Sequence, residues 1–214
     1  RFSHYCKKKG GFLLPMTTLK DLRPLSPAPF FNLSAEVPHA EKKKNFKRGR
    51  LPDITGLTGE GHLVDVSLLW SPLALYFEVK GRLSLDSGDQ IELFIDTRDL
   101  KNSHVVTRFC HHFIIDLEEE LGSEITRFRG DDTHLLADSS LISVSTEGKR
   151  SSFTSTISFP KEILFGYDPK EFDRMGLSYR FVRNNGEKQH FPLSSTFFNL
   201  EKHPALWASL HLCK

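Results

Sequence analysis

The sequence predicts an all-β protein, an antiparallel sandwich of two sheets preceded by an irregular, proline-rich segment. Three observations support this fold class. Apolar and polar residues alternate in many short runs that Gly, Pro, Asn and Asp separate. Phe is common, with 18 copies in 214 residues, and large aromatic rings suit the space between two packed sheets. The good helical candidate in the second half is short, over residues 160–165, with Pro at its first position.

Composition indicates a folded protein and excludes some partners. With 38% hydrophobic and 26% charged residues, the chain can bury a core and lacks the signature of disorder. A net charge of +2 argues against nucleic acid as a partner, and the basic run at 42–50 is interpreted as a solvated loop, with a phosphate or membrane-surface patch as the alternative. No stretch approaches the ~18 apolar residues of a membrane span. Three cysteines far apart in sequence favour a reducing compartment, and so the cytoplasm.

The chain divides into two parts. Residues 1–62 carry six prolines and four glycines after residue 14, which forbids long regular elements, and only 30–37 is expected to form a strand there. We therefore predict an irregular N-terminal extension over 1–62, which packs on or leads into the domain. The β-sandwich itself is predicted over 63–214.

Alternation begins at Leu63 and marks each strand in turn. Val64 to Trp70 predicts a half-buried strand, and Ser71–Pro72 turns the chain into a second strand that ends near Lys80. A third strand is expected over 91–95, and a fourth over 105–115 after the polar loop 97–103. Further strands are predicted at 124–129, 140–146, 152–159, 176–183 and 207–212.

The order of several segments resembles the family 9 carbohydrate-binding modules and the related DOMON-like sandwiches. The first half carries this likeness in 66–70, 75–79 and 89–96. The second half continues it in 157–160, 163–166, 175–179, 184–189 and 204–210. The resemblance covers roughly residues 60–213 and implies the two-sheet fold.

In sugar-binding members of that family, two Trp side chains clamp a sugar ring. Here the corresponding loops offer no Trp, and the second provides Phe197 and Phe198 instead. Trp70 and Trp207 fall where the family pattern places core residues, and both are expected in the core. Among the sugar-contacting positions, only Glu92 matches, so the resemblance implies carbohydrate binding at that residue alone.

A polar ligand floor is predicted on an outer sheet face. If Leu93 and Ile95 point inward, Glu92 points outward, and Arg108 and His112 point outward from the next strand if Phe109 and Phe113 are inward. One register of this strand pair places Glu92 opposite Arg108, and another places it opposite His112. We expect Tyr76, Arg180 and Phe198 to border this face. The alternative is a set of cross-strand ion pairs that contribute ~0.2–1 kcal/mol each to stability.

Other chemistry receives less support from the sequence. Glu92 and Asp96 lie about 13 Å apart along one strand, too far for a glycosidase pair. Cys110 and His112 share one face but supply only two metal ligands, so we expect no metal site and a buried or hydrogen-bonded His111 beside Phe113. Met175 is expected to be a packing residue and not a haem ligand. No cofactor is predicted.

These observations predict a non-catalytic binding domain that recognises a glycan or a small polar ligand. The alternative is a protein-interaction or structural module without a small-molecule ligand. A glycan site should show aromatic side chains and hydrogen-bonding groups in a groove, whereas an interaction module should show an apolar patch or an unprotected edge strand.

Overall fold

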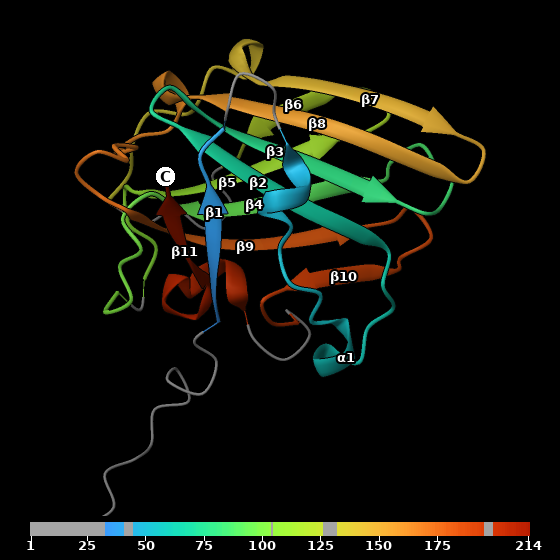
Figure 1. Cartoon of the computed structure of the whole chain (residues 1–214), viewed down its shortest axis with the longest axis horizontal. Coiled ribbons are helices and arrows are strands. Elements are labelled where there is room, and N and C mark those ends of the chain that lie inside the picture. Colours follow the sequence, from blue (N-terminus) through green and yellow to red (C-terminus); the bar gives the residue numbers. More distant parts are fainter. Residues whose placement is uncertain (1–32, 41–44, 104, 126–131, 195–198) are drawn as a thin grey trace, which may run out of the picture.

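Two β-sheets packed face to face form the protein in a computed structural model of the chain (Figure 1), which confirms the predicted fold class. The structure describes residues 33–40, 45–103, 105–125, 132–194 and 199–214. The four-stranded sheet has the order β2-β3-β8-β7. The seven-stranded sheet has the order β1-β11-β9-β4-β5-β6, with β10 also paired to β9.

The four-stranded sheet is built from two hairpins whose register follows their short turns. Its strands are β2 (Val64–Ser71), β3 (Ala74–Gly81), β7 (Ser143–Lys149) and β8 (Ser152–Pro160). The first hairpin confirms the predicted strand pair, since Leu68 faces Phe77 and Ser71 faces Ala74 across β2 and β3. All pairs in this sheet are antiparallel.

The seven-stranded sheet carries the polar residues of interest. Its strands are β1 (Ser34–Pro38), β4 (Gln90–Asp96), β5 (Cys110–Asp116), β6 (Leu121–Glu124), β9 (Arg174–Val182), β10 (Lys188–Phe191) and β11 (Ala208–Cys213). Strand β1 runs parallel to β11, whereas the other pairs of this sheet are antiparallel. The sequence did not predict β10.

Helical structure is minor among the described residues. The single α-helical turn is α1 (Thr55–Thr58), which contacts β10. The 3-10 turns are η3 (Phe46–Gly49), η4 (Ser139–Leu141), η5 (Lys161–Ile163), η6 (Leu200–Lys202) and η7 (Pro204–Leu206). The turn η5 falls within the predicted stretch 160–165. No helix in the described ranges has the length and apolar composition needed to cross a membrane.

The main core fills the space between the sheets. Strand alternation directs one set of side chains inward, and the rings of Phe77 and Phe113 both contact that of Phe159 across this space. The predicted core positions Trp70, Leu93 and Tyr179 belong to this cluster.

Two predicted core positions differ from the expectation. Trp207 is buried as predicted, but it packs with Phe94, Val106 and Cys110 in a second cluster. Phe94 alternates with the core residues Leu93 and Ile95 along β4, so this cluster lies on the outer face of the seven-stranded sheet. Phe109 is only half-buried, because β5 begins after it, at Cys110.

Candidate functional site

A row of ionisable side chains crosses the outer face of the seven-stranded sheet. Arg180 on β9 lies opposite Glu92 on β4 and opposite His190 on β10, so three strands contribute neighbouring positions. His112 on β5 lies diagonally beside Glu92 and completes the row at that end. We call His112, Glu92, Arg180 and His190 the polar row.

Glu92 is the centre of two interactions in the polar row. Arg180 donates to both of its oxygens, with Nη2 at 2.7 Å from each and Nε at 2.9 Å from Oε1. His112 Nε2 lies 2.9 Å from Oε2. Burial alone would raise the pKa of the Glu92 carboxyl, but the bond from His112 and the charge of Arg180 outweigh it and lower that pKa. Glu92 is therefore an ionised carboxylate at neutral pH.

The two histidines of the row are neutral. Burial lowers the pKa of His112, and the hydrogen bond to Glu92 only partly opposes this effect. Burial also lowers the pKa of His190, against the attraction of Glu60, whose Oε1 lies 2.6 Å from His190 Nδ1. Arg180 lies between them and its charge lowers both pKa values further.

The polar row is largely covered. The side chains of Glu92, His112 and His190 are exposed by 6%, 2% and 3%, and only Arg180, at 16%, retains contact with solvent. The ring of His112 stacks on Phe94 at 4.3 Å, and Phe94 in turn contacts Trp207 at 6.0 Å. The outward direction predicted for Glu92 is confirmed, but this part of the face is not open to solvent, and Glu60 contacts His190 there while Trp207 contacts Phe94.

The structure separates Arg108 from Glu92. Both registers proposed from the sequence are wrong, because Glu92 lies opposite Ile114 on β5. The connection between β4 and β5 extends to residue 109 and includes a turn in which Cys110 N donates to Thr107 O, so its centre is not at residue 100. Arg108 pairs instead with Asp132, whose Oδ1 lies 2.6 Å from Nε.

Tyr76, one of the expected border residues, does not join the polar row. Tyr76 lies on β3, opposite Leu69 and Ser158 in the four-stranded sheet, and the alternation of that strand directs it away from the sandwich core. The core therefore separates Tyr76 from Glu92, and its placement on the Glu92 face is wrong. Phe198 lies outside the described residues. Whether the predicted residues bind a ligand stays a prediction.

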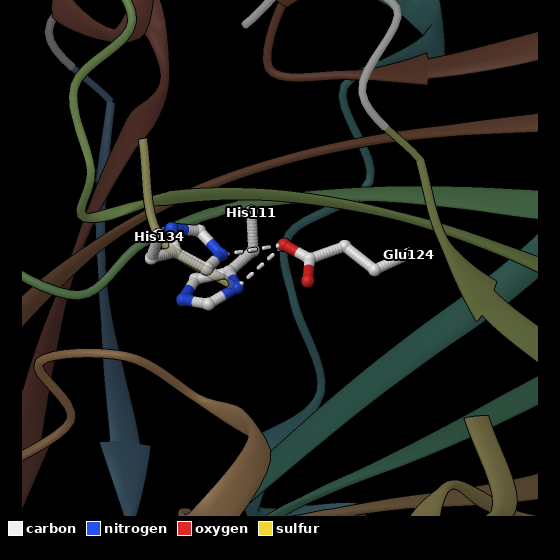
Figure 2. Close-up of side chains that lie close together, drawn as sticks. All are labelled: His111, Glu124 and His134. Carbon is white, nitrogen blue, oxygen red and sulfur yellow. Dashed lines mark hydrogen bonds and ion pairs between the residues drawn. The ribbon is translucent and has the colours of Figure 1, made fainter. Parts of the chain in front are cut away.

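A second cluster of ionisable residues lies on the inner side of the same sheet. Figure 2 shows the rings of His111 and His134 converging on the carboxylate of Glu124. His111 lies on β5, Glu124 ends β6 directly opposite Phe113, and His134 lies in the segment after β6. His111 is buried and stacks on Phe113, as the sequence predicted.

Both carboxylate oxygens of Glu124 accept hydrogen bonds. Oε1 lies 2.8 Å from His111 Nδ1 and 2.8 Å from His134 Nε2, and Oε2 accepts from Ala137 N at 2.7 Å. Burial alone would raise the pKa of the Glu124 carboxyl, but the bonds from the two histidines hold it far below its ordinary value. Burial lowers the pKa of His111.

Within the described residues, these three side chains are the one group of three or more His, Cys, Asp or Glu with ligand atoms close enough to share a metal ion. The two metal ligands considered from the sequence, Cys110 and His112, do not belong to this group. His112 bonds to Glu92, and Cys110 packs against Trp207. Burial raises the pKa of the Cys110 thiol to about 12, so it is not a ready thiolate ligand. Sequence reasoning missed Glu124 and His134 because Glu124 ends a short strand and His134 lies in a loop, so no strand alternation links them to His111.

An open groove lies where β2 and β11 end. It has a volume of about 580 Å³, within the range of ligand sites. Its lining residues are His39, Trp70, Pro72, Pro169, Lys170, Asp173, Leu212 and Lys214. The His39 ring meets the Trp70 indole edge-on at 4.9 Å, and Trp70 Nε1 donates to Cys213 O, which fixes the indole. We call this feature the Trp70 groove.

The Trp70 groove combines ring surfaces with charged side chains of both signs. Lys170 and Asp173 are exposed at its edge, whereas Trp70 itself is 3% exposed and forms part of the floor. The core position predicted for Trp70 is therefore confirmed. The sequence offered no signal for this groove, because residues from four separate stretches of chain meet there.

The fold has clear relatives among solved structures. A carbohydrate-binding module of family 9 from Caldicellulosiruptor kristjanssonii superposes with a TM-score of 0.58 in a complex with glucose, over 84% of this chain and 95% of that one at 12% identity. Its complex with cellotriose gives the same TM-score at 13% identity, over 84% and 93% of the two chains.

The chain has the fold of a family 9 carbohydrate-binding module. A protein from Bacteroides uniformis ATCC 8492, described as a putative carbohydrate-binding protein, shares this fold with a TM-score of 0.52, 9% identity and coverage of 84% of this chain and 99% of that one. No protein-family profile and no curated protein sequence matches the chain. At these identities the likeness establishes the fold, and function must be argued from the site.

Proposed function

We propose that this protein is a non-catalytic module that binds a carbohydrate in the Trp70 groove. The observation that carries the proposal is the groove itself, which is open, about 580 Å³ in volume and lined by the half-buried rings of His39, Pro72 and Pro169 together with the buried Trp70 indole. Flat apolar surfaces with a few polar groups at their edge suit a sugar ring, which has apolar faces and hydroxyl groups around its rim.

The charges around the groove favour a neutral polar ligand. Two lysines, Lys170 and Lys214, and one carboxylate, Asp173, line the groove, so charges of both signs meet there and the groove is not a field of one sign that would select an anion or a cation. Each can exchange hydrogen bonds with hydroxyl groups, because Lys donates and a carboxylate accepts. The sugar ligands named for two structures of the same fold agree with this chemistry.

A binding role is favoured over hydrolysis by how the buried carboxylates are used. Glu92 bonds to Arg180 and His112, and Glu124 bonds to two histidines. Asp96 accepts from Arg98 N and Leu100 N, at 2.9 and 2.8 Å. A glycosidase needs two carboxylates about 5–10 Å apart across an open cleft, whereas these three are occupied in structural bonds.

A glycan array followed by titration calorimetry tests the proposal. Lys170→Ala and Asp173→Ala should each weaken binding of the identified sugar about tenfold, the effect of one lost hydrogen bond to a charged group. Lys149→Ala, an exposed lysine at the end of β7, is the matched control and should bind as the wild type does.

The same experiment separates the groove from the polar row. If Arg180→Ala abolishes binding of the sugar while the two groove variants bind normally, the ligand lies at the polar row and the groove assignment is wrong. An array without any bound glycan, obtained with folded protein, would reject the carbohydrate class.

A protein-interaction role is the second candidate function. Strand β6 is an edge of the seven-stranded sheet in the described part of the chain, and it contacts η4. Leu121 on β6 and Leu141 on η4 are exposed by 65% and 46%. Replacement of both by Ser should abolish capture of a protein partner while leaving sugar binding intact, and an unchanged partner profile would reject this role.

A further inference from the structure

The His111, Glu124 and His134 cluster has a hydrogen-bonding pattern that two neutral histidines cannot satisfy. His111 Nδ1 faces Glu124 Oε1 at 2.8 Å and His111 Nε2 faces Phe165 O at 3.4 Å. His134 Nε2 faces Glu124 Oε1 at 2.8 Å and His134 Nδ1 faces Arg108 O at 2.5 Å. All four ring nitrogens therefore point at oxygen atoms that can only accept.

The number of ring protons is too small for this arrangement. A neutral imidazole carries one N–H, so two neutral rings supply two donors for four nitrogen–oxygen contacts. In two of these contacts a lone pair would face a lone pair. Protonation of one ring supplies a third donor and still leaves one contact without a proton; the contact of His111 Nε2 with Phe165 O, at 3.4 Å, is the longest of the four. Protonation of both rings would place two cations beside one carboxylate in side chains exposed by only 0–2%, and burial strongly disfavours uncompensated charge.

We propose that His111 Nδ1, His134 Nε2 and Glu124 Oε1 bind a divalent transition-metal ion of the zinc class. The ion replaces the two missing protons, since both nitrogens then present lone pairs to the metal. Their ligand atoms lie within 4.8 Å of one another, and ligands of a tetrahedral zinc ion with bonds of about 2.0–2.1 Å lie about 3.3 Å apart.

The surrounding backbone groups match what bound ligands require. With the metal on Nδ1 of His111 and Nε2 of His134, the remaining N–H of each ring donates to a backbone carbonyl, of Phe165 and Arg108 respectively. The second oxygen of Glu124 accepts from Ala137 N. Metal-binding histidines ordinarily donate their other N–H in this way, which fixes the tautomer and the ring orientation.

The ligand types select the class of metal. Two imidazoles and one carboxylate suit zinc and neighbouring first-row ions, whereas calcium and magnesium prefer all-oxygen sites. Three protein ligands leave one position of a four-coordinate ion to water. This proposal differs from the expectation drawn from the sequence, which considered only Cys110 and His112.

The ion fastens the segment 132–138 to the sheet. His134 and Ala137 both attach this segment to Glu124 at the end of β6, and Asp132 attaches it to Arg108. The neighbouring Leu135 is exposed by 94%, and the aliphatic side chain of this segment that packs against the main core is the small, partly buried Ala137. None of the residues 132–138 is a fully buried member of the main core, and we expect the sandwich to fold without the ion.

Cobalt titration of chelator-treated protein tests the metal site. Wild-type protein should bind one equivalent of Co²⁺ with the visible d–d absorption of a low-coordinate site, and Zn²⁺ should displace it while Ca²⁺ and Mg²⁺ should not. His134→Gln keeps a polar side chain near Glu124 but removes an imidazole ligand, and it should weaken binding more than about 100-fold. His211→Ala, an exposed histidine on β11, is the control and should bind normally.

Limited proteolysis gives a second readout that does not depend on spectra. Zn²⁺ should slow cleavage within 132–138 at least about tenfold in the wild type and in His211→Ala, and should have no effect in His134→Gln. The proposal is overturned if wild-type protein shows no Co²⁺ spectrum, or if folded His134→Gln gives the same spectrum and affinity as the wild type.

Discussion

At the scale of single residues, burial increases the contribution of the polar row to the stability of the fold. Glu92 was expected on an accessible face, where an ion pair contributes little to stability. In the structure its side chain is 6% exposed and bonds to Arg180 and His112. A buried charge that loses its partner is strongly unfavourable, so Glu92 has a structural role whatever the polar row binds.

Replacement of Glu92 by Ala should therefore destabilise the protein. The variant leaves the Arg180 guanidinium and His112 without their carboxylate, and we expect the free energy of unfolding to decrease by about 3–5 kcal/mol, measured by urea denaturation. Glu78→Ala is the control, because Glu78 pairs with the more exposed Lys80 on the outer face of the other sheet, and it should lose less than about 1 kcal/mol. Equal losses in both variants would contradict this account.

The neutral histidines of the polar row predict a loss of stability in mild acid. The pKa of His112 and of His190 lies below the ordinary histidine value of 6.5 in the folded protein, chiefly because of burial. The unfolded chain therefore takes up protons first as the pH falls below about 6.5, so stability is fully present above that pH and decreases below it. Urea midpoints at pH 8, 7, 6 and 5 should show this decrease.

A variant separates these histidines from the carboxylates. Glu92 also has a lowered pKa, but its contribution is lost only below the ordinary range of Glu, near pH 4.5. His190→Gln should therefore reduce the slope between pH 7 and 5 without changing the slope below pH 4.5. A midpoint that stays constant or rises from pH 7 to 5 in the wild type would exclude buried neutral histidines.

At the scale of elements, the length of each connection determined what could be predicted. The hairpin of β2 and β3 was predicted correctly because a two-residue turn, Pro72–Leu73, leaves one register that keeps the apolar residues inward. The connection between β4 and β5 is long and irregular. Alternation therefore predicted which side chains of each strand share a sheet face, but it did not predict which residues of the two strands lie opposite each other. Glu60 and His134 reach their partners from loops, and no periodic pattern encodes such contacts.

The segment from η3 to Leu51 covers the edge of β2 at close range. Leu51 N donates to Val66 O, and a Cβ added at Gly49 would lie 2.0 Å from Leu68 O. Gly49→Ala must therefore displace the segment, and we expect a loss of about 1–3 kcal/mol, seen as a lower thermal midpoint. Gly56→Ala is the control, because nothing lies within 4 Å of its added Cβ and Ala favours the helical turn α1.

Hydrogen exchange can show whether the close approach at Gly49 constrains the segment. Displacement of the segment should raise the exchange rate of the Leu51 amide in Gly49→Ala. If the amide stays as protected as in the wild type and the midpoint is unchanged, the close approach does not constrain the segment.

At the scale of the whole molecule, the division into an extension and a sandwich stays a prediction that truncation can test. Residues before 63 contribute buried apolar side chains, namely Val37, Phe46, Leu51 and Ile54, which are 0–9% exposed. Each contributes about 1.5–3 kcal/mol when buried. Glu60 also bonds to His190 on β10.

A chain beginning at residue 33 should accordingly be folded, whereas one beginning at residue 63 should not be. The expected result for the shorter chain is loss of near-ultraviolet circular dichroism and of amide proton dispersion at 25 °C, because the lost burial is comparable with the whole stability of a domain. A chain of residues 63–214 that melts cooperatively at the temperature of the longer one would show that the sandwich is complete without these residues.

The parallel pairing of β1 with β11 also determines how the protein responds to mechanical load. The two strands are in register from Ser34 beside Ser209 to Pro38 beside Cys213, so their starting ends lie together. Tension applied through the backbone at Leu33 and at Lys214 pulls the strands in opposite directions along their axes. The hydrogen bonds between them are then loaded in shear, all at once, and must break together instead of opening one after another. A pair that joins distant parts of the sequence thus acts as a mechanical clamp.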